Sequence, residues 1–381
     1  MQKSKRNFLI CFVQLFTKIK RRALFMEENK TSILHVINIA ESFTPKVFYE
    51  YYLNELGIYF RKNEETKDKG REEKCLLIDL SECKDIEGSV IPNLLVTGMI
   101  IKKETGNVPI LYIPENGDSK IINYLKEIQF EEINDFLDIF YVKTNGGIRK
   151  KKEYKLPDFC TTLYLSKKLS EESVAEELQK RYLPLFTRYL SDFTYEITNN
   201  ITKETKFVNL LEIFCKQICY NAILHGQSFC FTTMQVNQSR RKIFISIADC
   251  GKGMYNDFKD KMEYKKYQPY ILPSTLEGIK KYQRYEIDSM AIIEGIIYRF
   301  GDPVYGLWNV LKNVMDVSGI VRIHSGKARV IISDLDCEEF EEYKKKQACE
   351  LLLQKLKAKS CISKTPYYSG THVEIELPLK I

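Results

Sequence analysis

The stretch Leu211–Met254 constrains the fold of this chain more than any other, and reads LEIFCKQICYNAILHGQSFCFTTMQVNQSRRKIFISIADCGKGM. Its first half has apolar residues every three or four positions, which predicts an amphipathic helix that ends near Gly226. Its second half predicts a β-hairpin with strands over Phe229–Val236 and Lys242–Ala248. Asp249 ends the second strand and precedes two glycines. A carboxylate beside glycines that let a ligand approach the backbone is typical of a nucleotide pocket.

A polar stripe follows one face of the predicted helix. Gln217, Asn221 and His225 are spaced four residues apart, so they lie one above the other on that face. Taken alone, such a stripe is usually a solvated surface, and an Asp-x-Gly-x-Gly sequence is usually a turn. Each motif therefore has a structural interpretation as well as a functional one, and their order along the chain is what favours a binding site.

In this order, the two motifs resemble the N box and the G1 box of the GHKL ATPase superfamily. This superfamily includes the ATPase domains of histidine kinases, gyrase-type topoisomerases, mismatch-repair ATPases and anti-sigma-factor kinases. Two later segments extend the resemblance: Gly301–Leu307 resembles the G2 box, and Ser369–Leu377 resembles the final box with its strand. Over residues 165–381 the resemblance implies the Bergerat fold, an α/β sandwich with a mixed, mostly antiparallel sheet that binds ATP and Mg²⁺.

The resemblance also implies a role for each matching residue. Asp249 would accept a hydrogen bond from the adenine amine, with Thr371 beside it. Asn221 would be the Mg²⁺ ligand, because its amide oxygen is a hard, neutral donor. The remaining positions would approach the base or the phosphates, the latter at the N-terminus of a helix: His225, Gly251, Gly253, Gly306, Leu307 and Gly370. For His225, a purely structural hydrogen bond remains an equal alternative.

Gln217 departs from the family pattern, which usually has Glu four residues before the asparagine as the general base. A glutamine amide does not accept a proton at neutral pH, so we expect the attacking water to be poorly activated. Three functions remain. The first is a regulator that phosphorylates or sequesters a protein partner, the second is a slow ATPase that acts as a conformational switch, and the third is a nucleotide-binding scaffold without turnover.

Residues 31–143 read as a small α/β domain. Apolar strands are predicted at Cys75–Leu80, Val108–Ile113 and Leu137–Val142, and helical patterns separate them. Alternation of this kind favours parallel strands joined by right-handed crossovers. The sequence therefore predicts a parallel sheet ahead of the mostly antiparallel one.

The turn Asp79–Ser89 is similar to the strand-to-helix turn of STAS domains, which occur in anti-sigma-factor antagonists. That family carries Asp-Ser-Ser-Gly in this turn, and its first serine is phosphorylated. Here Glu87 and Gly88 stand at the Asp and first Ser positions, and only Ser89 matches. The departure puts phosphorylation by the family route in doubt, and a generic α/β domain remains an equal interpretation.

Two connecting segments are predicted. Residues 144–164 contain glycines and a basic run, which favours a linker. Residues 255–300 separate the G1 and G2 boxes, where the GHKL family has its ATP lid, and we expect them to be mobile.

The charge of the chain is concentrated at its beginning. The net charge is +7, and residues 1–25 hold seven basic residues and no acidic one, so the remainder is neutral overall. This argues against a general nucleic-acid surface. Residues 1–30 read as a basic extension whose apolar run Phe8–Phe16 is too short to span a bilayer. Either this extension anchors the protein to a membrane surface or Met26 is the natural start.

Eleven cysteines without paired metal-ligand spacing favour free thiols in a reducing cytoplasm. We therefore expect a cytoplasmic protein. The resemblance to the GHKL superfamily further implies a signalling role with a protein partner. The sequence leaves open whether it forms a homodimer.

Overall fold

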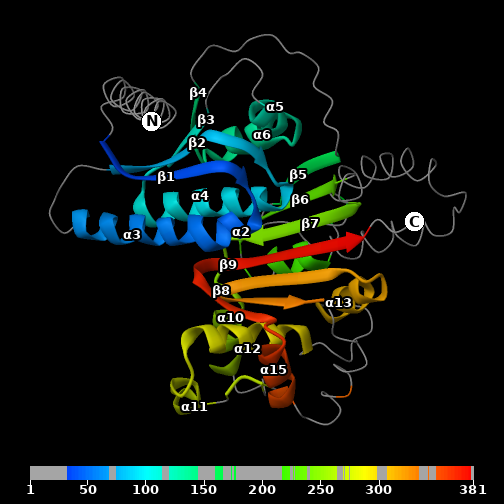
Figure 1. Ribbon diagram of the computed structural model, residues 1–381. Coiled ribbons are helices and arrows are strands. Elements are labelled where there is room, and N and C mark those ends of the chain that lie inside the picture. The colour runs from blue at the N-terminus through cyan, green and yellow to red at the C-terminus, as the bar shows by residue number, and fades with distance from the viewer. Residues whose placement is uncertain are drawn as a thin grey trace, which may run out of the picture.

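The computed structural model describes residues 32–67, 74–113, 120–144, 159–165, 217–223, 228–237, 241–263, 271–273, 275–297, 307–333 and 349–378, with single residues 173, 176, 226, 269 and 342. Helices and strands in these ranges form an α/β fold with two β-sheets, as expected (Figure 1). The first sheet is parallel, with strand order β1-β2-β3-β4. The second is antiparallel, with order β5-β6-β7-β9-β8.

The parallel sheet and its helices form the N-terminal unit. Its strands are β1 (Ser32–Phe43), β2 (Lys74–Ile86), β3 (Ile110–Ile113) and β4 (Tyr141–Thr144). Its helical segments are α2 (Pro45–Val47), the π-helical turn η1 (Phe48–Tyr52), α3 (Leu53–Lys67), the 3-10 turn η2 (Gly88–Val90), α4 (Ile91–Thr105), α5 (Lys120–Glu127) and α6 (Phe130–Leu137). Strand β1 has no counterpart in the prediction.

The strand predicted over Leu137–Val142 begins later than expected, because its first residue completes α6 and a turn follows. Helix α6 ends at Leu137, and β4 begins at Tyr141. The buried amide of Asn134 closes the turn between them: it accepts from Phe140 N at 2.8 Å and donates to Phe140 O at 3.1 Å. This local hydrogen bonding stops the helix where the apolar pattern alone favours a strand.

The second unit is built on the antiparallel sheet. Its strands are β5 (Phe159–Leu165), β6 (Cys230–Asn237), β7 (Lys242–Asp249), β8 (Ile320–Ile332) and β9 (Ile362–Pro378). Its helices are α10 (Met254–Glu263), α11 (Leu276–Lys280), α12 (Arg284–Ile297), α13 (Leu307–Asp316) and α15 (Cys349–Ala358). The predicted hairpin is confirmed as β6 and β7. Residues 159–164, expected within the linker, instead form most of edge strand β5.

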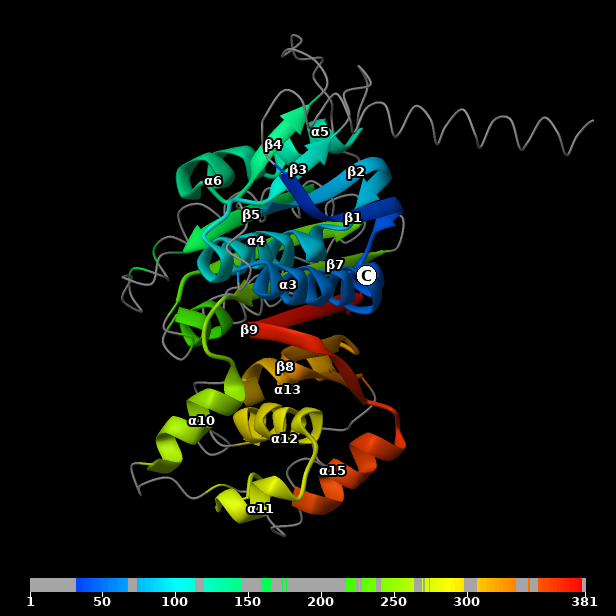
Figure 2. The ribbon, with the colours of Figure 1, turned by 90° about the vertical axis from the view of Figure 1, so that its left-hand side faces the viewer.

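Both faces of the antiparallel sheet are covered (Figure 2). Ile245 and Val373 lie on one face and pack into the core that α12 and α13 share. Helices α3 and α4 of the N-terminal unit cover the opposite face, so that they lie between the two sheets. The alternation of β7 and β9 predicts a solvent-facing side, yet Ser246, His372 and Glu374 on that side are buried. The N-terminal unit supplies the cover that the strands themselves do not encode.

Helix α12 limits the predicted lid. Its residues from Ile287 to Ile297 are buried except Gly295, and it packs on β8. The buried carboxylate of Glu294 accepts from Ile271 N at 2.8 Å and so ties the preceding loop to the helix. This buried part of α12, within the segment predicted as the lid, therefore belongs to the core.

Across the ranges given above, no helix is long and apolar enough to cross a membrane.

Candidate functional site

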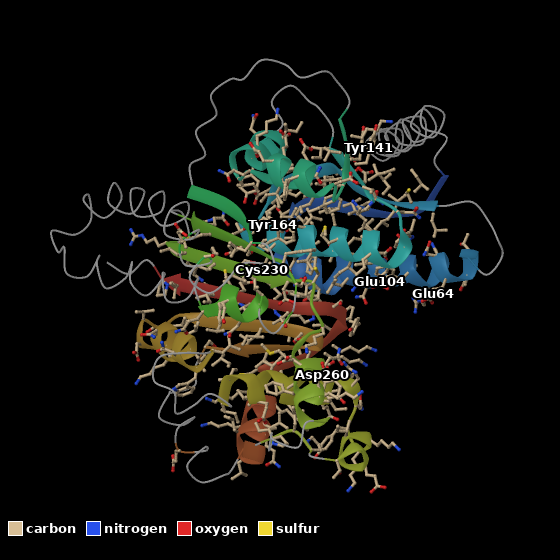
Figure 3. All side chains as sticks on the ribbon, turned by 180° about the vertical axis from the view of Figure 1, so that it is seen from behind. Glu64, Glu104, Tyr141, Tyr164, Cys230 and Asp260 are labelled. Carbon is tan, nitrogen blue, oxygen red and sulfur yellow. The ribbon has the colours of Figure 1, made fainter. Side chains whose placement is uncertain are left out.

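The candidate site is centred on Asp249, the last residue of β7. Asp249 pairs with Cys230, the first residue of β6, which is labelled in Figure 3. Because side chains alternate along a strand, Asp249 lies on the same face as Ile247, toward the helical layer. Only 3% of its surface is exposed, and its Oδ1 accepts from Gly251 N at 2.8 Å. The backbone N–H of Thr371 also donates to this carboxyl group.

The electrostatic state of Asp249 follows from its burial. Loss of hydration raises the pKa of the Asp249 carboxyl to about 7, while the two backbone donors lower it. The group is therefore balanced between its neutral and charged forms near physiological pH. A carboxylate has about four acceptor positions, so it retains capacity for a donor brought by a ligand.

Glycines bring three backbone segments close to Asp249. A Cβ atom at Gly370 would lie 2.0 Å from Asp249 O, and one at Gly251 would lie 2.3 Å from Gly226 O. Gly253 and Gly370 also have positive φ angles of 76° and 99°, which favour glycine. No other residue type fits at Gly251 or Gly370 without a shift of the backbone.

Two serines to which the sequence analysis gave no role hold these segments together. Ser325 Oγ accepts from Met254 N at 2.9 Å and donates to Gly370 O at 3.1 Å. Ser369 Oγ donates to Gly251 O at 3.3 Å. A serine within a strand has no distinctive spacing that would mark it as part of a site. The one sequence feature that could have drawn attention to Ser325 is the glycine that follows it, Gly326, where β8 shifts its register against β9.

The helix predicted to carry the polar stripe is present over residues 217–223. Gln217 and Asn221 are half-buried on it, whereas Ile218 and Ala222 belong to the core. Gly226, at its C-terminal end, lies so close to Asp249 that a Cβ atom there would be 2.9 Å from Asp249 Oδ1. The end of this helix therefore reaches the candidate site.

The structure does not test every predicted position. It brings together Asp249, Gly251, Gly253, Gly370 and Thr371, whereas His225 and Gly306 lie outside the described residues. Leu307 is buried and begins α13. Within the part of the chain that the structure describes, no group of three or more His, Cys, Asp and Glu side chains could hold a metal ion.

Ser89, which matches a position of the STAS turn, is not accessible. It is 1% exposed, and its backbone carbonyl accepts from Ser246 Oγ at 2.7 Å. The neighbouring Gly88 N donates to Gln235 Oε1 at 3.0 Å. The turn is therefore docked on the second sheet, and a kinase would have to separate the two units to reach the Ser89 hydroxyl.

Comparisons with known proteins give no family assignment, because no family model matches the chain and no curated protein matches it significantly. Any function for the site must therefore be argued from its geometry and from the motifs that the chain carries.

Proposed function

We propose that this protein binds ATP with Mg²⁺ at the Asp249 site and uses the bound nucleotide to control or phosphorylate a protein partner. One observation carries the proposal: a buried carboxylate ends a central strand and is surrounded by glycine backbone at which a Cβ atom does not fit. The carboxylate is shielded from water, and it keeps acceptor capacity for a donor on a ligand. The order of the four motifs along the chain supports the same conclusion.

The residues fit the two ends of a nucleotide. Asp249 accepts a hydrogen bond from the exocyclic amine of adenine, and the burial of Asp249 makes this hydrogen bond stronger than one exposed to water. Helix α13 has ten residues, and the amides of its first turn have no partners within the helix. Phosphate oxygens are favoured at such an N-terminus.

Asn221 is the residue that would hold Mg²⁺, through its amide oxygen. The ion, when bound, neutralises charge on the phosphates. Because Mg²⁺ keeps several waters and takes ligands from the phosphates, a site of this kind does not need a cluster of protein carboxylates.

Gln217 argues for a regulator rather than a motor. It stands one helical turn before Asn221, where a glutamate would act as general base. With an amide in that place, nucleotide turnover is slow, and the bound state lasts long enough to be sensed by a partner. A phosphoryl transfer to a protein hydroxyl supplied by that partner is also compatible with this arrangement.

The test is ATP binding, measured by calorimetry with and without Mg²⁺, on wild type and Asp249→Asn. Asp79→Asn is the matched control, because Asp79 is also a buried carboxylate whose Oδ1 accepts a backbone N–H two residues later, from Ser81 at 2.9 Å. We expect Asp249→Asn to lose ATP binding and Asp79→Asn to keep it. The single tryptophan, Trp308 at the start of α13, gives a second readout by fluorescence.

ADP release from the same samples separates the alternatives. Phosphate on a partner protein supports the regulator, and steady turnover that requires Asn221 supports a slow ATPase switch. Binding with neither leaves a scaffold. Absence of ATP binding to wild type would refute the proposal.

A further inference from the structure

A line of buried hydrogen bonds links the N-terminal unit to the antiparallel sheet. Tyr49, on η1, bonds to His372 Nδ1 on β9. His372 Nε2 lies 2.8 Å from Ser246 Oγ on β7, and Ser246 Oγ donates to Ser89 O on η2 at 2.7 Å. The line starts and ends in the N-terminal unit and crosses two strands of the other sheet.

The direction of each bond can be deduced. Ser246 has one hydroxyl proton, and the Ser89 carbonyl takes it, so Ser246 Oγ must accept from His372 Nε2–H. His372 Nδ1 then has no proton and accepts from the Tyr49 hydroxyl. Burial and the neighbouring charges of Arg329 and Arg322 hold the pKa of His372 well below its usual range, which agrees with a neutral ring. One tautomer satisfies every member.

Asn93 strengthens the same contact from α4. Its Nδ2 lies 3.0 Å from His372 Nδ1 and donates to the Tyr49 hydroxyl oxygen, and its Oδ1 accepts from the hydroxyl of Tyr368 at 3.0 Å. Tyr368 and His372 flank the segment that contains Gly370. Two residues of the N-terminal unit therefore hold β9 on both sides of the backbone that lies against Asp249.

His372 directly follows Thr371, whose backbone N–H donates to the Asp249 carboxyl. His372 also pairs with Ala248, the residue before Asp249, across β7 and β9. A displacement of the His372 ring moves the same backbone that positions Thr371. The contact at the interface and the hydrogen bond at the candidate site thus share one short piece of β9.

We propose that the N-terminal unit sets the nucleotide affinity of the Asp249 site, with Tyr49 and Asn93 acting as positioning residues through His372 and Thr371. This inference rests on the proposed function for its effect on affinity. Its structural half, that Tyr49 holds the Asp249 turn in place, does not need a nucleotide. Anything that loosens the interface then lowers the occupancy of the site, so the N-terminal unit acts as its regulatory part.

The test compares Tyr49→Phe with Tyr52→Phe. Both tyrosines are buried, and each variant loses one hydroxyl, but the Tyr52 hydroxyl bonds to Thr97 Oγ1 at 3.1 Å within the N-terminal unit. Hydrogen exchange of residues 246–253 and 368–373 is measured without nucleotide, and the ATP dissociation constant is measured by calorimetry. We expect Tyr49→Phe to speed exchange in both segments and to weaken ATP binding about five- to tenfold, the usual consequence of losing one buried hydrogen bond.

If the Tyr49 hydroxyl has only a structural role, both variants should lose similar amounts in melting temperature. Their hydrogen exchange and their ATP dissociation constants should then also be alike. Equal exchange in Tyr49→Phe and Tyr52→Phe overturns the proposal. If wild type does not bind ATP, the proposed function fails, while the exchange data still decide whether Tyr49 holds the Asp249 turn. Should Tyr49→Phe not fold, Ser246→Ala removes the acceptor for His372 Nε2–H and should speed exchange in the same two segments.

Discussion

Thr371 and His372 are neighbours in β9 whose side chains lie on opposite faces of the antiparallel sheet. Thr371 pairs with Ser325 on the side of the helical layer, with 3.5 Å between their hydroxyl oxygens. His372 lies among Tyr49, Asn93 and Ser246 on the side of the N-terminal unit. Two adjacent residues thereby join the candidate nucleotide site to the interface between the units. Only one peptide bond separates the residue at the site from the residue at the interface.

Asp249→Asn should stabilise the nucleotide-free protein, and more at pH 8 than at pH 5. Burial raises the pKa of the Asp249 carboxyl from 3.8 to about 7. A group whose pKa is higher in the folded state contributes stability below the unfolded pKa and loses it as pH rises through the folded pKa. At about 1.4 kcal/mol per pKa unit, the charged carboxylate costs the fold on the order of 4 kcal/mol above pH 7.

Asparagine has no charge to bury, but it offers fewer acceptor positions to the two backbone donors, so it recovers only part of this cost. Urea unfolding of both proteins at about pH 5 and about pH 8 measures the difference. The advantage of the variant should grow between these values and then level off. A constant difference at both pH values would contradict the assignment of a buried, charged Asp249.

Gly370→Ala should abolish nucleotide binding and destabilise the protein. Gly106→Ala should destabilise the protein mildly and leave nucleotide binding unchanged. Both glycines have positive φ angles, 99° and 79°. A Cβ atom at Gly370 would lie 2.0 Å from Asp249 O, whereas one at Gly106 meets nothing within 4 Å. Backbone strain alone costs about 1 kcal/mol at Gly106, and displacement of β7 or β9 adds several kcal/mol at Gly370.

Thermal melts and ATP calorimetry on the two alanine variants check this pair. Normal ATP affinity in Gly370→Ala would contradict the proposal that ATP binding depends on the close approach of the Gly370 backbone to Asp249. Equal losses of stability in both variants would mean that the strain, and not the close approach to Asp249, dominates.

Gln217→Glu should convert slow turnover into measurable ATP hydrolysis. The change restores a carboxylate one turn before Asn221, and general-base catalysis typically contributes 10² to 10⁴ in rate. Phosphate release at saturating ATP is the measurement, and Gln217→Ala is the control that lacks both amide and carboxylate. No gain in Gln217→Glu, with ATP binding intact, would show that residue 217 is not placed to activate water.

Local patterns in the sequence identified the elements that depend on near neighbours. The hairpin of β6 and β7, helix α13 and the Asp-x-Gly-x-Gly turn all follow from spacing and turn residues within a few positions. Burial of the sheet face that the N-terminal unit covers does not follow from such local patterns. Tyr49 and His372 are 323 positions apart, and alternation in β9 makes His372 and Glu374 look solvent-facing. Their cover comes from another unit, and no periodicity within a strand encodes it.

Glu294→Gln should release the segment of Ile271 and Leu272, which precedes α11, without disturbing the Asp249 turn. The Glu294 carboxylate is fully buried and accepts from Ile271 N at 2.8 Å and from Leu272 N at 3.4 Å. Hydrogen bonds to a charged acceptor contribute about 1.5 to 3 kcal/mol, and a neutral amide recovers only part of this. Hydrogen exchange at Ile271 and Leu272 should accelerate, while exchange over residues 246–253 stays unchanged. Glu277→Gln, on the exposed helix α11, is the control. If ATP binds wild type and Glu294→Gln equally but leaves the variant faster, the loop acts as a gate; equal dissociation rates would confine Glu294 to a structural role.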